Sequence, residues 1–340
     1  MIEIAPTSTL PRASHIPKRR IHLAGTEERV MDPVHKGRVR FIPVLAIVAV
    51  LATPVLALAA SPEPALVPVW QSANRSLHLS IDPTGRLWAS TPDSTFDIYD
   101  RDGKLLETWG TFGRGDGQFD FQTPAGGKGG VTFRPDGGFY VSDSDNARIQ
   151  EFDANRAFVR SWGSFGTGDD QFIGPDSLAL DAAGNIYVNE TGGDRAWIHV
   201  FDPTGTQVRV IREEAQGPFF AVDPDGTVYV IDEAASDLIR VGSDGSSEVI
   251  ADMSGLIAFG TGVLHMLDGS FLVASERDAG VDATGQANLV HLGPSGEILN
   301  VWSGPNGGEY MALDPAGDRF YVSAPPPSSE LRAYEFHPGM

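Results

Sequence analysis

The chemistry open to this chain depends on a small set of side chains. It has no cysteine, which excludes thiol catalysis and disulfides. The histidines after residue 60 are His78, His199, His265, His291 and His337. An imidazole suits proton transfer near neutral pH, and the carboxylates of Asp176 and Glu309 would suit Ca²⁺. A zinc site would need several convergent imidazoles, so the chemistry depends on how the fold positions these groups.

Two segments of the chain repeat one another. Trp109–Phe119 reads WGTFGRGDGQF and Trp162–Phe172 reads WGSFGTGDDQF, so they match at eight of eleven positions, 53 residues apart. A period near 50 residues indicates a repeat architecture.

Six short turns give a second measure of the repeat. Each ends in a glycine followed by an alternating apolar run, as in DPTG-RLWAS from Asp82 and DPDG-TVYVI from Asp223. The turn glycines are Gly85, Gly137, Gly184, Gly226, Gly269 and Gly317. A run on each side of such a turn predicts a hairpin, and most units add a second turn and a fourth strand. The sequence therefore predicts an all-β fold, a six-bladed β-propeller of four-stranded antiparallel blades.

The two ends of the chain are predicted to share one blade. The last unit ends after its third strand, LRAYEF (331–336). The segment ALVPVWQS (65–72) has the apolar spacing of a fourth strand, and its Trp70 aligns with Trp109 and Trp162. We expect this N-terminal strand to complete the C-terminal blade and close the ring, which removes open sheet edges.

One unit carries a recognisable family pattern. The segment VSDSDNARIQEFD (141–153) resembles the NHL repeat, because Asp143, Asn146 and Arg148 fall on its D-x-x-N-x-R positions. The resemblance covers residues 65–339 and implies a propeller of a kind that serves as a binding scaffold and, in some members, as a lyase or hydrolase. We expect these three side chains to hydrogen-bond within and between blades, because buried polar groups need partners.

The N-terminus predicts export. Residues 1–60 form a polar leader whose apolar part, 41–60, follows basic residues and ends in small ones, which is typical of a signal peptide. A membrane anchor is the alternative, since 20 apolar residues can span a bilayer, and Met31 is a candidate start. We expect residues 61–340 to form a propeller located outside the cell, at its surface or in the periplasm.

The charge of the exported part limits its partners. Residues 61–340 hold 17 Lys and Arg against 41 Asp and Glu, a formal charge of −24. Nucleic-acid binding relies on basic residues that displace counterions from phosphates, so we expect no nucleic-acid partner. Membrane contact is expected only through an uncleaved N-terminal segment, and the domain is expected to be monomeric.

Binding is expected on the face opposite the tight turns. Connections of varied length gather there, and loops on a rigid scaffold usually carry binding sites. They are residues 112–130, 165–175, 189–195, 275–287 and 324–329.

The innermost strands define a candidate ligand site at the mouth of the central channel on that face. Alignment on the turns brings together an imidazole, carboxylates and aromatic rings that could hold a small or cationic ligand. The candidate residues are His78, Lys128, Asp176, Ser177, Phe219, Glu309 and Tyr310. We expect only His78 among the histidines to face the axis, with His337 in a turn.

These features predict a non-catalytic module that binds a protein, a peptide or a small molecule through the variable-loop face. No Ser-His-Asp arrangement is visible, and no cofactor is predicted for this function. The alternative is a calcium-dependent hydrolase or lactonase-like propeller, with its site near His78, Asp176 and Glu309 and with Ca²⁺ as its metal.

Overall fold

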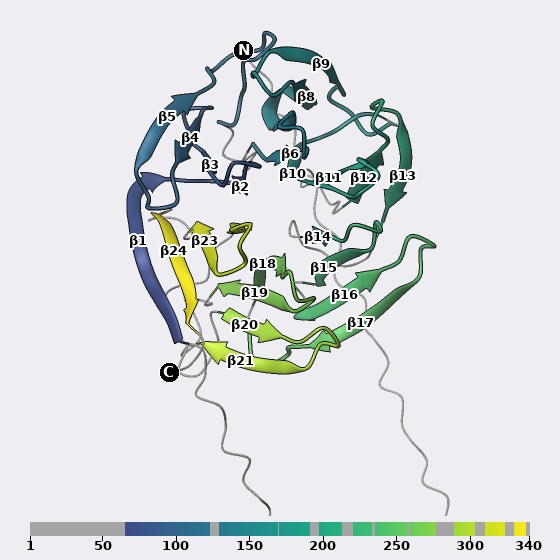
Figure 1. Cartoon of the computed structure of the whole chain (residues 1–340). Helices are drawn as coiled ribbons and strands as arrows, with labels where there is room; N and C mark the ends of the chain where they lie inside the picture. Colours follow the sequence, from purple (N-terminus) through teal and green to yellow (C-terminus); the bar gives the residue numbers. More distant parts are fainter. Residues whose placement is uncertain are drawn as a thin grey trace, which may run out of the picture. The chain divides into compact units, whose positions relative to one another are not determined.

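The computed structural model forms a ring of six sheets (Figure 1). It describes residues 65–122, 129–168, 170–190, 197–212, 220–232, 235–257, 259–276, 289–302, 310–323 and 330–337. All of these lie in the compact unit Leu58–Met340. The predicted leader and apolar segment, residues 1–60, lie outside the described residues. The described residues contain no α-helix, and one 3₁₀ turn, η1, covers Ser144–Asn146.

Each sheet is a four-stranded antiparallel blade, which confirms the predicted fold class. Blade 1 consists of β2 (Leu79–Ile81), β3 (Leu87–Ser90), β4 (Phe96–Tyr99) and β5 (Leu105–Trp109). Blade 2 consists of β6 (Val131–Phe133), β7 (Phe139–Asp143), β8 (Arg148–Phe152) and β9 (Phe158–Trp162). Blade 3 consists of β10 (Pro175–Leu180), β11 (Ile186–Glu190), β12 (Trp197–Phe201) and β13 (Gln207–Ile211).

The second half of the ring follows the same order. Blade 4 consists of β14 (Phe220–Val222), β15 (Val228–Asp232), β16 (Asp237–Val241) and β17 (Ser247–Asp252). Blade 5 consists of β18 (Phe259–His265), β19 (Phe271–Glu276), β20 (Leu289–Leu292) and β21 (Ile298–Trp302). Blade 6 consists of β22 (Tyr310–Leu313), β23 (Arg319–Ser323), β24 (Glu330–His337) and β1 (Ala65–Arg75).

The first strand of each of blades 1 to 6 lies innermost. Each of these six strands contacts the innermost strands of the two neighbouring blades, and the contacts form a closed cycle (Figure 1). In that cycle β10 and β22 are three steps apart, so blades 3 and 6 face each other across the central channel.

The N-terminal strand closes the ring as predicted. β1 pairs antiparallel with β24 as the outermost strand of blade 6. Trp70 from this strand packs 6.1 Å from Tyr99 of blade 1, and its indole N–H donates to the carbonyl of Arg101 at 3.0 Å. A Cβ at Gly103 would overlap the Trp70 ring, so the seam requires glycine there. His337, expected in a turn, is instead the last residue of β24, where it pairs with Ala65.

The hydrophobic core lies between neighbouring blades. Between blades 1 and 2 it is built from aromatic rings, and the repeated WGxFGxGDxQF segment supplies two of them. Trp109 packs 5.4 Å from Phe119 and 5.2 Å from Phe152 of the next blade. Phe119 is fully buried, so the apolar ends of this segment are explained by packing.

The turn aspartates tie each hairpin to its own strands. The carboxylate of Asp82 accepts hydrogen bonds from the backbone and hydroxyl of Thr84, from Arg86 and from the Trp88 indole N–H. Burial alone would raise the pKa of Asp82, but these hydrogen bonds together lower it below its usual value. The charged form is therefore favoured in the folded state.

One outer turn departs from the glycine pattern. The turn between β8 and β9 places Arg156 at φ 65°, where the corresponding turns of blades 1, 3, 4 and 5 have glycine. The Arg156 guanidinium lies 5.0 Å from the Trp88 ring centre and binds Glu107 of blade 1 with two hydrogen bonds, at 2.6 and 3.0 Å. A strained backbone conformation thus accompanies a contact between two blades.

Candidate functional site

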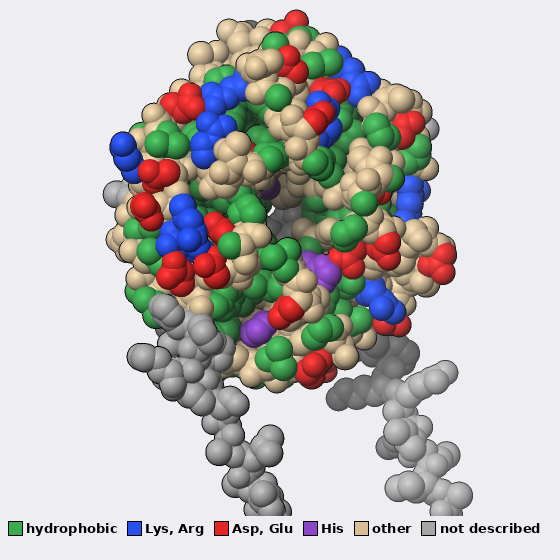
Figure 2. All heavy atoms as spheres, in the orientation of Figure 1, with side chains coloured by type: hydrophobic (Ala, Val, Ile, Leu, Met, Phe, Trp, Pro, Cys, Tyr) green, Lys and Arg blue, Asp and Glu red, His purple; other side chains and the backbone are tan. Residues whose placement is uncertain are grey.

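The central channel contains the candidate site. A cavity of about 250 Å³ is lined by residues from the innermost strands of all six blades. Figure 2 shows the corresponding hollow at the centre of the ring, with acidic side chains spread over the surrounding face. Apolar residues such as Leu79, Val131, Leu178, Phe220 and Val263 alternate with polar ones in the lining, and the surface that faces the cavity is more polar than apolar. Polar groups reach it from His78, Ser80, Ser177, His265 and Tyr310.

A hydrogen bond crosses the channel at the variable-loop end. The Tyr310 hydroxyl of blade 6 donates to Oδ2 of Asp176 of blade 3 at 2.8 Å. Both residues are almost fully buried, with exposed fractions of 4% and 2%. His78 of blade 1 packs against the Tyr310 ring at 4.7 Å between ring centres. Because blades 3 and 6 are opposite, this contact narrows the channel at the mouth, where the sequence predicted a ligand site.

Glycine lets the blades approach closely beside this contact. The backbone N–H of Gly130 donates to the Ser142 hydroxyl at 2.6 Å, and that hydroxyl also contacts the carbonyl of Asp176. A Cβ at Gly130 would overlap the same carbonyl oxygen. Two other serines act in the same way at the ends of β3 and β23. The Ser90 hydroxyl accepts a hydrogen bond from the backbone N–H of His78, and the Ser323 hydroxyl accepts one from that of Tyr310. These hydroxyls hold the innermost strands at the level of the candidate site.

The structure brings together some of the predicted site residues. His78, Ser177 and Tyr310 line the cavity, whereas Asp176, which accepts the hydrogen bond of Tyr310, is not one of the lining residues. The other predicted residues, Lys128, Phe219 and Glu309, lie outside the described residues, as do parts of all five variable loops.

Sequence reasoning missed His265. We expected His78 alone among the histidines to face the axis, and this is wrong because His265 also lines the cavity. It is the last residue of β18, next to the turn, where strand alternation points to packing between blades. Its Nδ1 contacts the carboxylate of Asp223, the first residue of the turn in the neighbouring blade 4. The signal available in the sequence was a histidine at a position that is apolar in the other five units.

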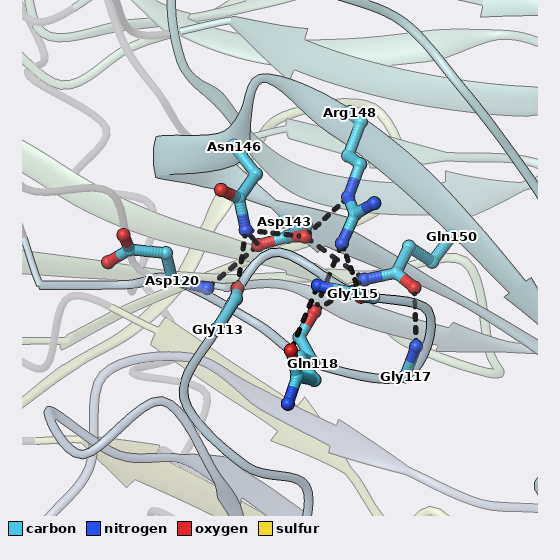
Figure 3. A network of polar contacts seen from close by, with 9 residues as sticks. All are labelled: Gly113, Gly115, Gly117, Gln118, Asp120, Asp143, Asn146, Arg148 and Gln150. Carbon is cyan, nitrogen blue, oxygen red and sulfur yellow. Dashed lines mark hydrogen bonds and ion pairs between the residues drawn. The ribbon is translucent and has the colours of Figure 1, made fainter.

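The three NHL-like residues form a polar network (Figure 3), and none of them lines the cavity. Asp143 is fully buried and accepts hydrogen bonds from Asn146, from Arg148 Nε at 2.7 Å and from the backbone N–H of Asp120 at 2.8 Å. Burial raises the pKa of Asp143 above its usual value, although these hydrogen bonds oppose the shift. Asn146 also donates to the carbonyl of Gly113. The network therefore fastens the connection from blade 1 onto blade 2, which is a structural role.

Blade 3 builds the same fastening from other residues. Glu190 ends β11 as Asp143 ends β7, and it accepts from the backbone N–H of Ile173 on the incoming connection. His199 Nε2 lies 3.0 Å from Glu190, and its Nδ1 lies 2.8 Å from Gln207. The second WGxFGxGDxQF segment thus docks on a carboxylate as the first one does. His199 lies on the third strand, as expected, and is held there by structural contacts.

Metal-ligating side chains do not gather in the part of the chain that the structure describes. No group of three or more His, Asp or Glu side chains lies close enough there to hold an ion. Calcium takes about six to eight oxygen ligands, usually including several carboxylates. Among the described residues that line the cavity there is no carboxylate, and one oxygen of Asp176 already accepts from Tyr310. The described channel residues therefore do not fit a calcium site.

One family model matches part of the chain. The model of the family described as SMP-30/Gluconolactonase/LRE-like region matches residues 62–219, somewhat under half of the chain. The matched segment contains β1 and all of blades 1 to 3. The chain therefore resembles this propeller family over that segment, while its NHL resemblance rests on the residues of blade 2.

Solved structures share the fold at low sequence identity. A gluconolactonase from Xanthomonas campestris is 14% identical with a TM-score of 0.58, over 83% of this chain and 93% of that one. A putative gluconolactonase is also 14% identical with a TM-score of 0.58, over 82% of this chain and 94% of that one. A streptogramin B lyase is 11% identical with a TM-score of 0.54, over 80% of this chain and 98% of that one. At these identities the similarity concerns the fold alone.

Two further searches gave negative results. No curated protein matches the chain. None of the helices within the described residues is long and apolar enough to cross a membrane.

Proposed function

We propose that this protein is an exported propeller that binds a small molecule in its central channel without chemical conversion. The observation that carries the proposal is the cavity of about 250 Å³, lined from all six blades. Ligand sites are typically concave and mostly apolar, with a few convergent polar groups. In the channel, His78, Ser177, His265 and Tyr310 supply the convergent polar groups, and lining residues such as Phe220 and Met311 supply apolar side chains.

The geometry also supports a rigid, preformed site. The Tyr310–Asp176 bond and the packing of His78 fix the side chains at one end of the cavity. The contact of His265 with Asp223 fixes a side chain at the other end. A ligand that enters such a site orders few protein groups, so less of its binding energy is lost to conformational entropy.

Ligand-observed NMR on Leu58–Met340 tests the proposal, with toluene as an apolar probe and tetramethylammonium as a cationic one. We expect saturation transfer from the protein to toluene, and its loss in Ser80→Phe, which places a ring in the cavity. Ser295→Phe puts the same side chain on an exposed turn and should leave the signal unchanged. The channel is not a ligand site if neither probe receives saturation, or if Ser80→Phe leaves the saturation of both probes unchanged.

The second candidate function is a calcium-dependent lactonase-like enzyme, and the family match over residues 62–219 favours it. Its test is the melting temperature of Leu58–Met340 with added Ca²⁺ and with chelator, together with elemental analysis and an assay for hydrolysis of glucono-δ-lactone. A metal that binds only the folded state stabilises it by about 2.7 kcal/mol at a hundredfold excess over Kd. A rise in melting temperature with Ca²⁺ and measurable hydrolysis would favour the enzyme over the binding module.

A further inference from the structure

His265 occupies a position that the repeat does not explain. The residue directly before the first turn of each unit is Ile81, Phe133, Leu180, Val222, His265 or Leu313. Five of the six are apolar and partly buried, as expected for packing between blades. A polar ring at the sixth has no counterpart in the repeat, so its role must come from its own contacts.

The carboxylate beside His265 belongs to the ordinary turn structure. The Tyr229 hydroxyl donates to Asp223 at 2.9 Å, as Trp88 does to Asp82 and Tyr187 to Asp181 in other blades. Burial and Asp223 raise the pKa of Tyr229 to about 12, so this hydroxyl keeps its proton. A hydrogen bond from an aromatic side chain to the turn aspartate therefore recurs among the blades. The contact with His265 is found in addition to it in blade 4.

The imidazole is held in one orientation. Its Nδ1 contacts Asp223, and its ring stacks on Phe271 with 4.6 Å between centres and an angle of 18°. The Tyr229 ring lies 5.2 Å away on a tilted plane. A neutral histidine whose Nδ1–H donates to a carboxylate presents Nε2 as a hydrogen-bond acceptor.

The second ring nitrogen of His265 makes no contact with Asp223. His265 lines the cavity and Asp223 does not, so we infer that Nε2 is directed toward the cavity. The neighbouring lining residues Val222 and Leu264 are apolar. An oriented acceptor beside these two apolar residues is complementary to a ligand with an apolar body and one hydroxyl donor.

We propose that Nε2 of His265 accepts a hydrogen bond from the weakly acidic hydroxyl of a phenol-like or enol-like ligand in the channel. The proposal rests on the proposed function, because it names the class of ligand that the same cavity takes. His265 positions the hydroxyl, Asp223 fixes the imidazole, and Val222 and Leu264 lie beside the rest of the ligand.

A matched pair of probes tests the anchor. Phenol and toluene have similar size, and only phenol carries the hydroxyl. Calorimetry on Leu58–Met340 should give tighter binding of phenol in the native protein. His265→Phe uses the residue type found at Phe133 and should weaken phenol binding roughly fivefold, since one hydrogen bond contributes about 1 kcal/mol. Toluene binding should stay the same or improve.

The outcomes separate the two proposals. Equal affinities for phenol and toluene, both lost in Ser80→Phe, would overturn the hydroxyl anchor and leave channel binding standing. No binding of either probe would overturn both. A measurement on the native protein does not depend on the folding of a variant, because phenol should shift the Nε2 resonance of His265 in ¹⁵N-histidine spectra. An unchanged resonance at saturating phenol would overturn the anchor.

Discussion

Removal of the Asp143 carboxylate should strongly destabilise the propeller while leaving the channel intact. Asp143→Ala deprives Asn146, Arg148 and the backbone N–H of Asp120 of their common buried acceptor. Breaking a buried ion pair on one side costs roughly 3–5 kcal/mol. The low end applies, because Arg148 keeps its hydrogen bonds to the carbonyls of Gly115 and Gln118. We therefore expect a loss of about 3 kcal/mol.

The assay is thermal unfolding of Leu58–Met340 followed by circular dichroism. A loss of about 3 kcal/mol corresponds to a fall in melting temperature of roughly 6–12 °C for a domain of this size. Asp116→Ala is the matched control, since Asp116 lies in the same connection but is exposed, and it should change the melting temperature by about 1 °C or less. If Asp143→Ala has the same melting temperature as Asp116→Ala, the network does not fasten blade 1 to blade 2.

Three further predictions concern the seam, a strained turn and pH. Gly103→Ala should destabilise more than Gly245→Ala in denaturant unfolding, because both have positive φ but only Gly103 has the Trp70 ring against it; equal losses would contradict the seam packing. Arg156→Ala should be less stable than Arg156→Gly by about 1 kcal/mol, because alanine retains the positive φ without the contacts of arginine; a reversed order would show that the backbone there is unstrained. The folded pKa of Asp82 is lowered, so its contribution is present above about pH 4 and lost as pH falls through the folded value. The destabilisation caused by Asp82→Asn should accordingly be smaller at about pH 3 than at pH 7, and a pH-independent difference would refute the shift.

The sequence predicts the fold well because a repeat multiplies weak local signals. One glycine turn is ambiguous, whereas six in register specify the hairpins, and the alignment of Trp70 with the other outer-strand tryptophans predicts the closure that β1 and β24 make. The alignment of inner strands likewise brought His78, Ser177 and Tyr310 to the channel.

The details of the site depend on contacts that no local pattern encodes. Tyr310 and Asp176 are 134 residues apart and meet only because blades 3 and 6 are opposite in the ring. His265 stands where alternation predicts an apolar packing residue, and its place in the cavity lining and its contact with Asp223 are seen only in the folded ring. Such departures from the repeat mark the positions where function is to be sought.

The most direct test of channel binding is a crystal structure of Leu58–Met340 soaked with phenol. The account predicts a bound ring between the levels of Tyr310 and His265, with its oxygen within about 3 Å of Nε2 of His265. A channel without bound phenol, under conditions where phenol binds in solution, would contradict the account.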